Sequence, residues 1–279
     1  MNNLVKVLII AGLAIGIFGG GGYLAYRLFF KKPDRLKLGV NHAVVTPTPD
    51  AGVTMFEQAN HEIEHGDKES GEKILWALIQ NLPNSEKNGD AKKLLSSLNV
   101  REFFSTQSGR DKTEYVVARG DSMARIAGKT KCAAELIFKA NGLDSLTIQP
   151  GQKFIIPRGE FSLLINLKKH DLTLLNKGAF FRWYEPLEFK IPAAAAVSGQ
   201  YKVHEKIAWS AGTRVAFGEK NYLGSSRWIV ISSNGTAIYS ETNPQSPNAQ
   251  KPANGIMLAA SDMEELFALV AKDTPIIVK

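Results

Sequence analysis

The sequence predicts an α+β multidomain protein with an apolar N-terminal segment, a short helical region, a βααβ module and a mainly-β C-terminal domain. Three observations predict this fold class. Residues 54–104 carry apolar side chains at helical spacing, residues 115–157 change from strand-like to helix-like patterns and back, and from residue 161 onward short β-rich runs are separated by turns. With 44% hydrophobic residues over 279 positions, the chain is long and apolar enough for two or three folded units.

Residues 1–32 are predicted to be a transmembrane anchor or a signal sequence. The stretch 4–30 is apolar apart from Lys6 and Arg27, and it is long enough to cross a bilayer as a helix. The glycines at 19–22 weaken that helix and would alternatively mark the end of a signal-peptide hydrophobic region. We favour a retained single-pass anchor because no small-x-small site is followed by a convincing mature start.

A linker and a helical region follow the apolar segment. Residues 33–53 include Thr46-Pro47-Thr48-Pro49 and are predicted to be an extended linker. Residues 54–108 are predicted to be helical, because breaks at Gly66-Asp67 and at 82–85 separate three apolar stripes: Phe56, Ala59 and Ile63; Ile74, Leu75, Leu78 and Ile79; and Ala91, Leu94, Leu95 and Leu98. The pattern resembles a tetratricopeptide-type helical hairpin with one extra helix. We expect the stripes to form the region's own core or to pack on the neighbouring domain.

Composition and spacing argue against several classes of function. His61 and His65 have a spacing that can hold a metal, yet no third ligand is apparent, so we expect a solvated helix face and no metal. Cys132 is the only cysteine, which excludes an intrachain disulfide and a cysteine-based metal site. We expect no cofactor. The net charge of +7 comes without interleaved basic and aromatic residues, so we expect no nucleic acid partner.

Residues 113–158 are predicted to form the βααβ module. The β-rich run Tyr115-Val116-Val117 stops at Gly120, and Asp121 or Ser122 can cap the helix that begins there. A second helix carries its apolar residues between 136 and 140, and Asn141-Gly142 is a typical helix stop. The turn at Pro150-Gly151 then leads into a second strand at 153–157.

The order Gly-Asp-Ser, Asn-Gly-Leu and Pro-Gly-Gln in this module closely resembles the LysM module. The resemblance implies binding of N-acetylglucosamine-containing glycans such as peptidoglycan, in a shallow groove between the first strand-helix loop and the loop after the second helix. Short polar side chains and backbone amides suit a neutral sugar, and an apolar wall meets the ring face. Carried onto this sequence, the candidate glycan-binding residues are Gly120, Asp121, Ser122, Met123, Asn141, Gly142, Leu143 and Ile148.

Residues 160–279 are predicted to form a mainly-β domain. Strands are predicted at 161–167, 172–175 and 180–184, and further strands at 200–204, 228–232 and 276–278. A late helix is predicted at 262–271, capped by Ser261 or Asp262, with Glu264 and Glu265 in its first turn.

This domain is similar to the L,D-transpeptidase catalytic domain, also called the YkuD domain. The resemblance rests on Ile165-Asn166-Leu167-Lys168-Lys169-His170-Asp171-Leu172, on Asp262-Met263-Glu264-Glu265-Leu266, and on Asp273-Thr274-Pro275-Ile276. The resemblance implies attack on a peptide carbonyl by a cysteine thiolate that a histidine activates. Gly255 stands at the cysteine position, Ala253 and Tyr239 at histidine positions, and Met257 at the arginine position, with Ser240 beside Tyr239.

The sequence therefore predicts a pseudoenzyme. Glycine has no side chain, and Cys132 lies in the module, so covalent catalysis at position 255 is excluded. Ser240 or Ser261 would be a poor nucleophile without a histidine at the matching positions. We expect a membrane-anchored cell-envelope protein that binds peptidoglycan and carries a catalytically inactive domain. Two alternatives stay open: an active L,D-transpeptidase or carboxypeptidase with an unrecognised nucleophile, and a protein-protein scaffold of the envelope or division machinery.

The expected location is the cell membrane, with the bulk of the chain periplasmic or otherwise extracytoplasmic. Basic residues after the apolar segment outnumber those before it, and counted alone they would keep the C-terminal side in the cytoplasm. A glycan-binding module meets its ligand outside the cytoplasm, and we let this expectation outweigh the charge count.

Overall fold

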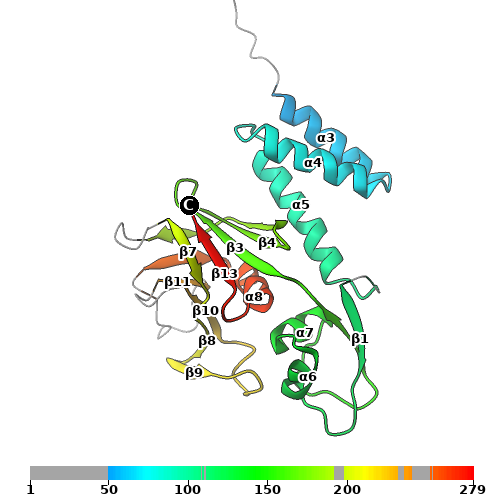
Figure 1. The fold of residues 1–279 in the computed structure, drawn as a ribbon, viewed down its shortest axis with the longest axis vertical. Coiled ribbons are helices and arrows are strands. Elements are labelled where there is room, and N and C mark those ends of the chain that lie inside the picture. The colour runs from blue at the N-terminus through cyan, green and yellow to red at the C-terminus, as the bar shows by residue number, and fades with distance from the viewer. Residues whose placement is uncertain are drawn as a thin grey trace, which may run out of the picture. The chain divides into compact units, whose positions relative to one another are not determined.

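The computed structural model describes residues 50–107, 109, 111–191, 198–231, 236–240, 252 and 254–279. Three helices come first, followed by a small module and a domain of two sheets (Figure 1). Among these residues, no helix is both long and apolar enough to cross a membrane. The predicted anchor at 4–30 and most of the linker lie outside the described residues.

The helical region consists of α3 (Ala51–Glu64), α4 (Lys68–Asn81) and α5 (Asn88–Phe103), which confirms the predicted stripes. Its buried core contains Ala59, Leu75, Leu78, Ala91, Leu95 and Leu98. Helix α3 begins three residues before the predicted boundary at 54 because Asp50 caps it, accepting a 2.9 Å hydrogen bond from Gly52 N. The same carboxylate accepts a 2.8 Å bond from Ser85 Oγ, which ties the start of α3 to the loop before α5.

Helix α5 also packs on the C-terminal domain. Ser96 Oγ accepts a 2.9 Å hydrogen bond from Trp183 N, and Asn99 Nδ2 donates a 2.9 Å bond to Phe181 O. The ammonium group of Lys92 lies 5.0 Å from the centre of the Trp183 ring, an attractive cation-π distance. The helical region is therefore a fixed neighbour of the sheet.

The module has the predicted βααβ order. Strands β1 (Lys112–Val116) and β2 (Lys153–Pro157) pair antiparallel, and α6 (Met123–Thr130) and α7 (Ala134–Ala140) lie between them in the chain. Of the two predicted caps for α6, Ser122 is the one at the N-cap, where its Oγ accepts from Arg125 N at 3.3 Å. The module has a core of its own, made of Val117, Met123, Ile126, Ile137, Phe154 and Ile156.

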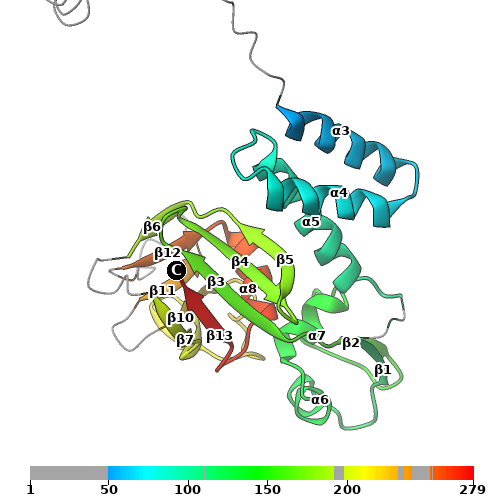
Figure 2. The same ribbon diagram turned by 45° about the horizontal axis from the view of Figure 1, so that its top comes forward.

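The C-terminal domain is built from two sheets (Figure 2). The five-stranded sheet has the order β5-β4-β3-β13-β7, with β3 Phe161–Asn166, β4 Asp171–Asn176, β5 Ala179–Tyr184, β7 Gly199–Lys202 and β13 Pro275–Val278. The six-stranded sheet has the order β6-β12-β11-β10-β8-β9, with β6 Glu188–Lys190, β8 Glu205–Ser210, β9 Thr213–Val215, β10 Ser226–Val230, β11 Ala237–Ser240 and β12 Gly255–Leu258. The six strands that the sequence predicted are confirmed, whereas β6, β8, β9, β11 and β12 were not predicted.

One helix, α8 (Ala260–Leu269), joins the core that both sheets share. Its first turn is held by Arg182 of β5, which donates 2.8 Å hydrogen bonds to Asp262 and to Glu265. The predicted cap was wrong: the helix begins at Ala260, Ala259 is at the N-cap, and no side chain caps it. The Asp262 carboxylate lies inside the first turn and pairs with Arg182 instead.

Candidate functional site

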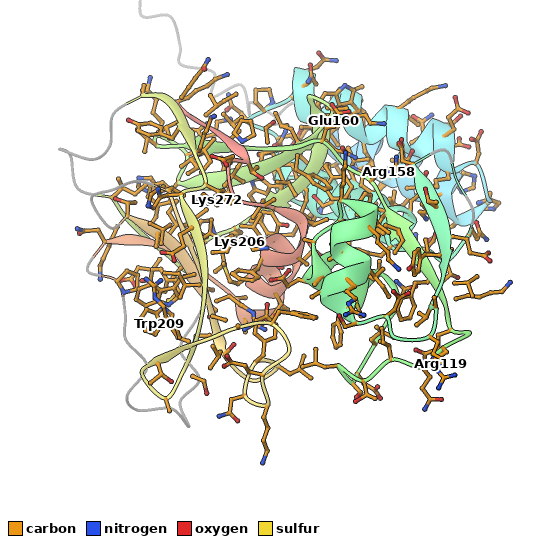
Figure 3. The ribbon with its side chains drawn as sticks, turned by 60° about the horizontal axis from the view of Figure 1, so that its bottom comes forward. Arg119, Arg158, Glu160, Lys206, Trp209 and Lys272 are labelled. Carbon is orange, nitrogen blue, oxygen red and sulfur yellow. The ribbon has the colours of Figure 1, made fainter. Side chains whose placement is uncertain are left out.

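Residues of both candidate loops contribute to the core of the module. Met123 is buried in that core, and Leu143 and Ile148 pack against it with part of their surface exposed. Gly120 and Gly142 are exposed, with φ angles of 83° and 57° that favour glycine. Arg119, on the first loop, lies at the outer end of the module in Figure 3. Of the sequence-predicted residues, Met123, Leu143 and Ile148 therefore share one core.

Asp121 is committed to bonds inside the module. Its carboxylate accepts hydrogen bonds from Lys129 Nζ at 2.7 Å, from Tyr115 Oη at 2.7 Å and from Ala118 N at 2.9 Å. These three donors, Lys129 first, hold the pKa of the Asp121 carboxyl at about 2. Asp121 thus fastens the first loop to β1 and α6, and its acceptors are already occupied.

This cluster predicts an acid sensitivity of the module. Because the folded pKa of Asp121 is about 2, below that of the unfolded chain, its stabilising effect is complete above about pH 4 and is lost as the pH falls through about 2. We expect the melting temperature of the wild type to drop over this interval and that of Asp121→Asn to change less. Circular dichroism at fixed salt measures both, and parallel curves would contradict the assignment.

Asn141 is also committed to internal bonds. Its Nδ2 donates to Ile137 O at 2.8 Å and to Ile155 O at 2.9 Å, while its Oδ1 accepts from Ile155 N at 2.7 Å. The side-chain amide therefore joins the end of α7 to the middle of β2. What remains available to a ligand is the exposed backbone of both loops, the Ser122 hydroxyl, and the apolar surface of Leu143 and Ile148.

Three of the altered catalytic positions, Tyr239, Gly255 and Met257, lie on one face of the six-stranded sheet. Tyr239 pairs with Met257, and Ala237 pairs with Gly255, across the parallel strands β11 and β12. Tyr239 is buried, and its hydroxyl donates a 3.2 Å hydrogen bond to Glu188 on β6. Burial, together with the charge of Glu188, raises the pKa of the Tyr239 hydroxyl to about 12.

Gly255 has no space for a side chain. A Cβ atom placed there would lie 2.1 Å from the carbonyl oxygen of Ala237 and 3.2 Å from Cε1 of the Tyr239 ring. Ser240 points to the opposite face of the sheet, where its buried Oγ accepts a 3.2 Å hydrogen bond from Arg227 N. Ala253 lies outside the described residues. Position 255 therefore carries no nucleophile, because it is a glycine, and the neighbouring backbone leaves no space for a larger residue.

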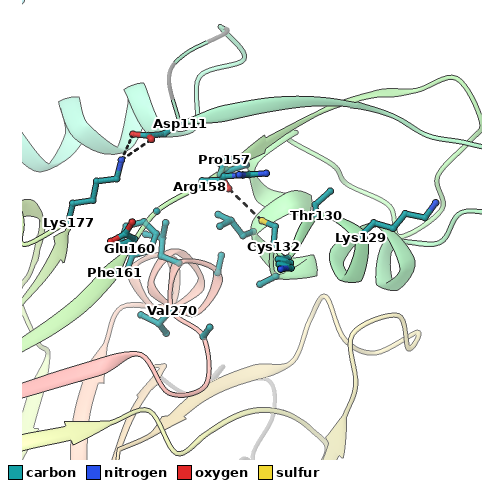
Figure 4. Close-up of a pocket in the computed structure, with 17 residues that line it drawn as sticks. Asp111, Lys129, Thr130, Cys132, Pro157, Arg158, Glu160, Phe161, Lys177 and Val270 are labelled. Atoms are coloured by element: carbon teal, nitrogen blue, oxygen red, sulfur yellow. Dashed lines mark hydrogen bonds and ion pairs between the residues drawn. The ribbon is translucent and has the colours of Figure 1, made fainter.

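The environment of Cys132, the one cysteine of the sequence, makes its thiol unreactive. Cys132 lines a cavity of about 630 Å³ between the module and the C-terminal domain, near the ion pair of Lys177 with Asp111 (Figure 4). Its Sγ donates to Pro157 O at 3.7 Å, and burial raises the pKa of the thiol to about 11. At neutral pH this group is a protonated thiol, which is a poor nucleophile.

A cluster of polar side chains between α7, α8 and β10 was not predicted from the sequence. Tyr222, from the connection between β9 and β10, donates from its hydroxyl to Glu135 of α7 at 3.0 Å. Arg227 of β10 is buried, and its Nε lies 3.0 Å from an oxygen of Glu264 on α8. No periodicity marks the loop that carries Tyr222, so the sequence held no signal for this junction.

Comparisons with known proteins match one segment of the chain to a family. Residues 115–157 match the family model of the LysM domain. No curated protein matches the chain.

Solved structures with similarity to the chain include L,D-transpeptidases. One from Mycobacterium smegmatis has 15% identity and a TM-score of 0.30; the match covers 46% of this chain and 63% of that one, less than two thirds of its length. L,D-transpeptidase 3 from Mycobacterium tuberculosis, in complex with a faropenem-derived adduct, has 14% identity and a TM-score of 0.30. That match covers 60% of this chain and 92% of the other. A mutant of the Enterococcus faecium L,D-transpeptidase has 16% identity and a TM-score of 0.30, and the match covers 75% of this chain and 89% of the other.

Similarity at this level assigns no activity to the chain. What the comparisons identify is a LysM segment at residues 115–157.

Proposed function

We propose that this protein is a membrane-anchored cell-envelope protein that binds peptidoglycan through residues 115–157 and carries a catalytically inactive L,D-transpeptidase-like domain. The LysM match over residues 115–157 is the observation that carries the binding proposal. The exposed loop backbone and the half-buried Leu143 and Ile148 support it, because they offer hydrogen bonds and an apolar surface to a neutral sugar.

Three features support the absence of catalysis. The single cysteine of the chain is Cys132, whose thiol is half-buried with a raised pKa. Position 255 is a glycine against which Ala237 O and the Tyr239 ring pack closely. Tyr239, at a histidine position of the resemblance, is a buried phenol bonded to Glu188 rather than a base at neutral pH.

Removing the apolar wall of the candidate groove tests the binding proposal. We expect Leu143→Ala to weaken retention of the full-length protein on purified peptidoglycan by about tenfold, because an apolar contact of this size is worth roughly 1–2 kcal/mol. A sedimentation assay measures the bound fraction against peptidoglycan concentration.

Val116→Ala is the matched control, because Val116 is 53% exposed and lies on β1, outside both loops. The control is expected to bind as the wild type does. Equal retention of Leu143→Ala and the wild type would place the groove elsewhere, and no retention of the wild type would overturn the binding proposal.

Incubation with muropeptides tests the inactive domain. We expect mass spectrometry to detect neither cross-linked nor trimmed products. Turnover that survives Cys132→Ala would favour the alternative of an active enzyme with an unrecognised nucleophile. The extracytoplasmic location is tested separately with topology reporters fused after Lys279. If only the reporter that works in the cytoplasm is active, the module lies in the cytoplasm and has no access to the glycan.

A further inference from the structure

Helix α7 is buried by two different cores. Ile137 belongs to the core of the module, whereas Leu136, the residue before it, belongs to the core of the C-terminal domain. Successive residues of a helix point about 100° apart, so one helix can face both cores. In both views of the ribbon, α7 lies beside α8 (Figures 1 and 2). The helix that ends at the second candidate loop is therefore shared by the module and the domain.

The connection between β9 and β10, residues 216–225, packs on the same helix. Phe217 lies on this connection and contacts the core of the module. The centre of its ring lies 6.1 Å from that of Phe138 on α7 and 5.0 Å from that of Tyr222, both edge to face. Phe217 and Leu143 also line one cleft of about 430 Å³. An aromatic side chain of the C-terminal domain thus supports the helix and the loop that we assign to glycan binding.

Polar contacts fix the orientation of α7 on the domain. Glu135, in the first turn of α7, accepts a 3.0 Å hydrogen bond from Tyr222 Oη, and Lys206 Nζ lies 4.0 Å from the same carboxylate. Lys206 also donates a 3.0 Å bond to Val270 O at the end of α8. Tyr222 is held in turn by Arg227, which donates to its carbonyl at 3.0 Å. Apolar packing has no direction whereas hydrogen bonds do, so these contacts select one orientation of the helix.

The loop after α7 makes few hydrogen bonds of its own. Among the described residues, positions 143–148 bond only to Phe138 O and, within the loop, to Ser145 Oγ. The conformation of this loop therefore depends on packing, and Phe217 is a neighbour that the C-terminal domain contributes. A loop that must be ordered when a ligand binds lowers the affinity, whereas a loop held in place beforehand does not.

We propose that the C-terminal domain positions the second glycan loop of the module, with Phe217 and Tyr222 as the positioning residues. This inference rests on the proposed glycan binding. Neither residue has to touch the glycan: Phe217 supports α7 and the loop, and Tyr222 orients α7 through Glu135. Because coupling between two parts of a protein is reciprocal, a glycan bound to the module also stabilises the C-terminal domain.

Tryptophan fluorescence reports on the domain without reporting on the module. The four tryptophans of the chain all lie outside residues 113–158: Trp76, Trp183, Trp209 and Trp228. Thermal unfolding of the full-length protein is followed by this signal, with and without a chain of four N-acetylglucosamine units. At a ligand concentration about a hundredfold above the Kd, we expect the midpoint to rise by roughly 5–10 °C, because the module and the domain unfold together.

Two substitutions together remove the support. Phe217→Ala deletes the aromatic contact, and Tyr222→Phe deletes only the hydroxyl that bonds Glu135. We expect the double variant to bind the same oligosaccharide about tenfold more weakly in calorimetric titration, because its loop must be ordered on binding. At about a hundredfold excess over its own Kd, its fluorescence-detected shift is expected to fall below about half of the wild-type shift. Phe217→Leu, which keeps an apolar side chain, should recover most of the affinity.

Lys220→Ala is the matched control, because Lys220 is an exposed residue of the same connection, and it should keep the wild-type affinity and shift. Wild-type affinity in the double variant overturns the positioning role. An undiminished shift in that variant also overturns it, because the glycan then stabilises the domain without these contacts.

Two results of the wild type separate this inference from the glycan proposal. Binding in the titration without a shift of the fluorescence midpoint refutes the coupling and leaves glycan binding in place. Absence of binding refutes both. If the double variant does not fold, Tyr222→Phe alone is judged by the same two criteria, since it keeps the ring and removes one hydroxyl.

Discussion

Replacing Asn141 with alanine is expected to lower the free energy of unfolding by about 2–4 kcal/mol, the cost of stranding part-buried backbone groups. The variant leaves Ile155 N and the carbonyls of Ile137 and Ile155 without the amide that now bonds them at 2.7–2.9 Å. Denaturant unfolding followed by circular dichroism measures the difference, provided that the slope of the transition is unchanged.

Asp144→Ala is the control for this variant. Asp144 is an exposed residue of the same loop, so its removal is expected to change the stability by less than about 0.5 kcal/mol. If Asn141→Ala unfolds at the wild-type denaturant concentration and yet loses retention on peptidoglycan, the amide contacts the glycan directly and the clamp is not its main role. A loss of both stability and retention indicates that the amide positions the groove.

The module shows what sequence patterns can predict and what they cannot. The turn and cap residues Gly120, Ser122 and Pro150 act within a few positions of themselves, so the order of strands and helices followed from local signals. The bonds of Asn141 to Ile155 cross from α7 to β2. No local pattern distinguishes an amide that clamps a strand from one that faces a ligand, which is why two predicted binding side chains turn out to be occupied inside the module.

In the C-terminal domain, alternating burial made β3 and β4 predictable, whereas β11, one of the strands that the sequence did not predict, is wholly buried. β3 and β4 alternate between buried and partly exposed residues, and the sequence located both. All residues of β11 are buried, so Ala237 to Ser240 carry no alternation, and β12 begins at a glycine that strands normally avoid. The pairing of Gly255 with Ala237 explains that glycine, because the close approach of the two strands leaves no space for a Cβ atom.

Restoring a cysteine at position 255 is expected to destabilise the protein by about 2–3 kcal/mol or more, and to produce no acyl-enzyme. The Cβ would lie 2.1 Å from Ala237 O, a backbone atom that moves only if the β11–β12 pairing shifts. The Tyr239 ring lies 3.2 Å from the same position. Its hydroxyl donates a hydrogen bond to Glu188 and cannot act as a general base at neutral pH. Thermal unfolding measures the first effect, and mass spectrometry after incubation with an acyl donor measures the second.

Gly255→Ala separates the steric effect from the chemistry of the thiol, because alanine adds the Cβ atom without sulfur. This variant should be destabilised to a degree similar to that of Gly255→Cys. Both variants are best placed on a Cys132→Ala background, so that every thiol signal comes from position 255. Wild-type stability of Gly255→Cys, with rapid alkylation or acylation of the new thiol, would mean that the position is vacant rather than closed. Adding Tyr239→Ala distinguishes the two obstacles: if the ring is the main one, the double variant regains part of the lost stability, whereas a clash dominated by Ala237 O persists without it.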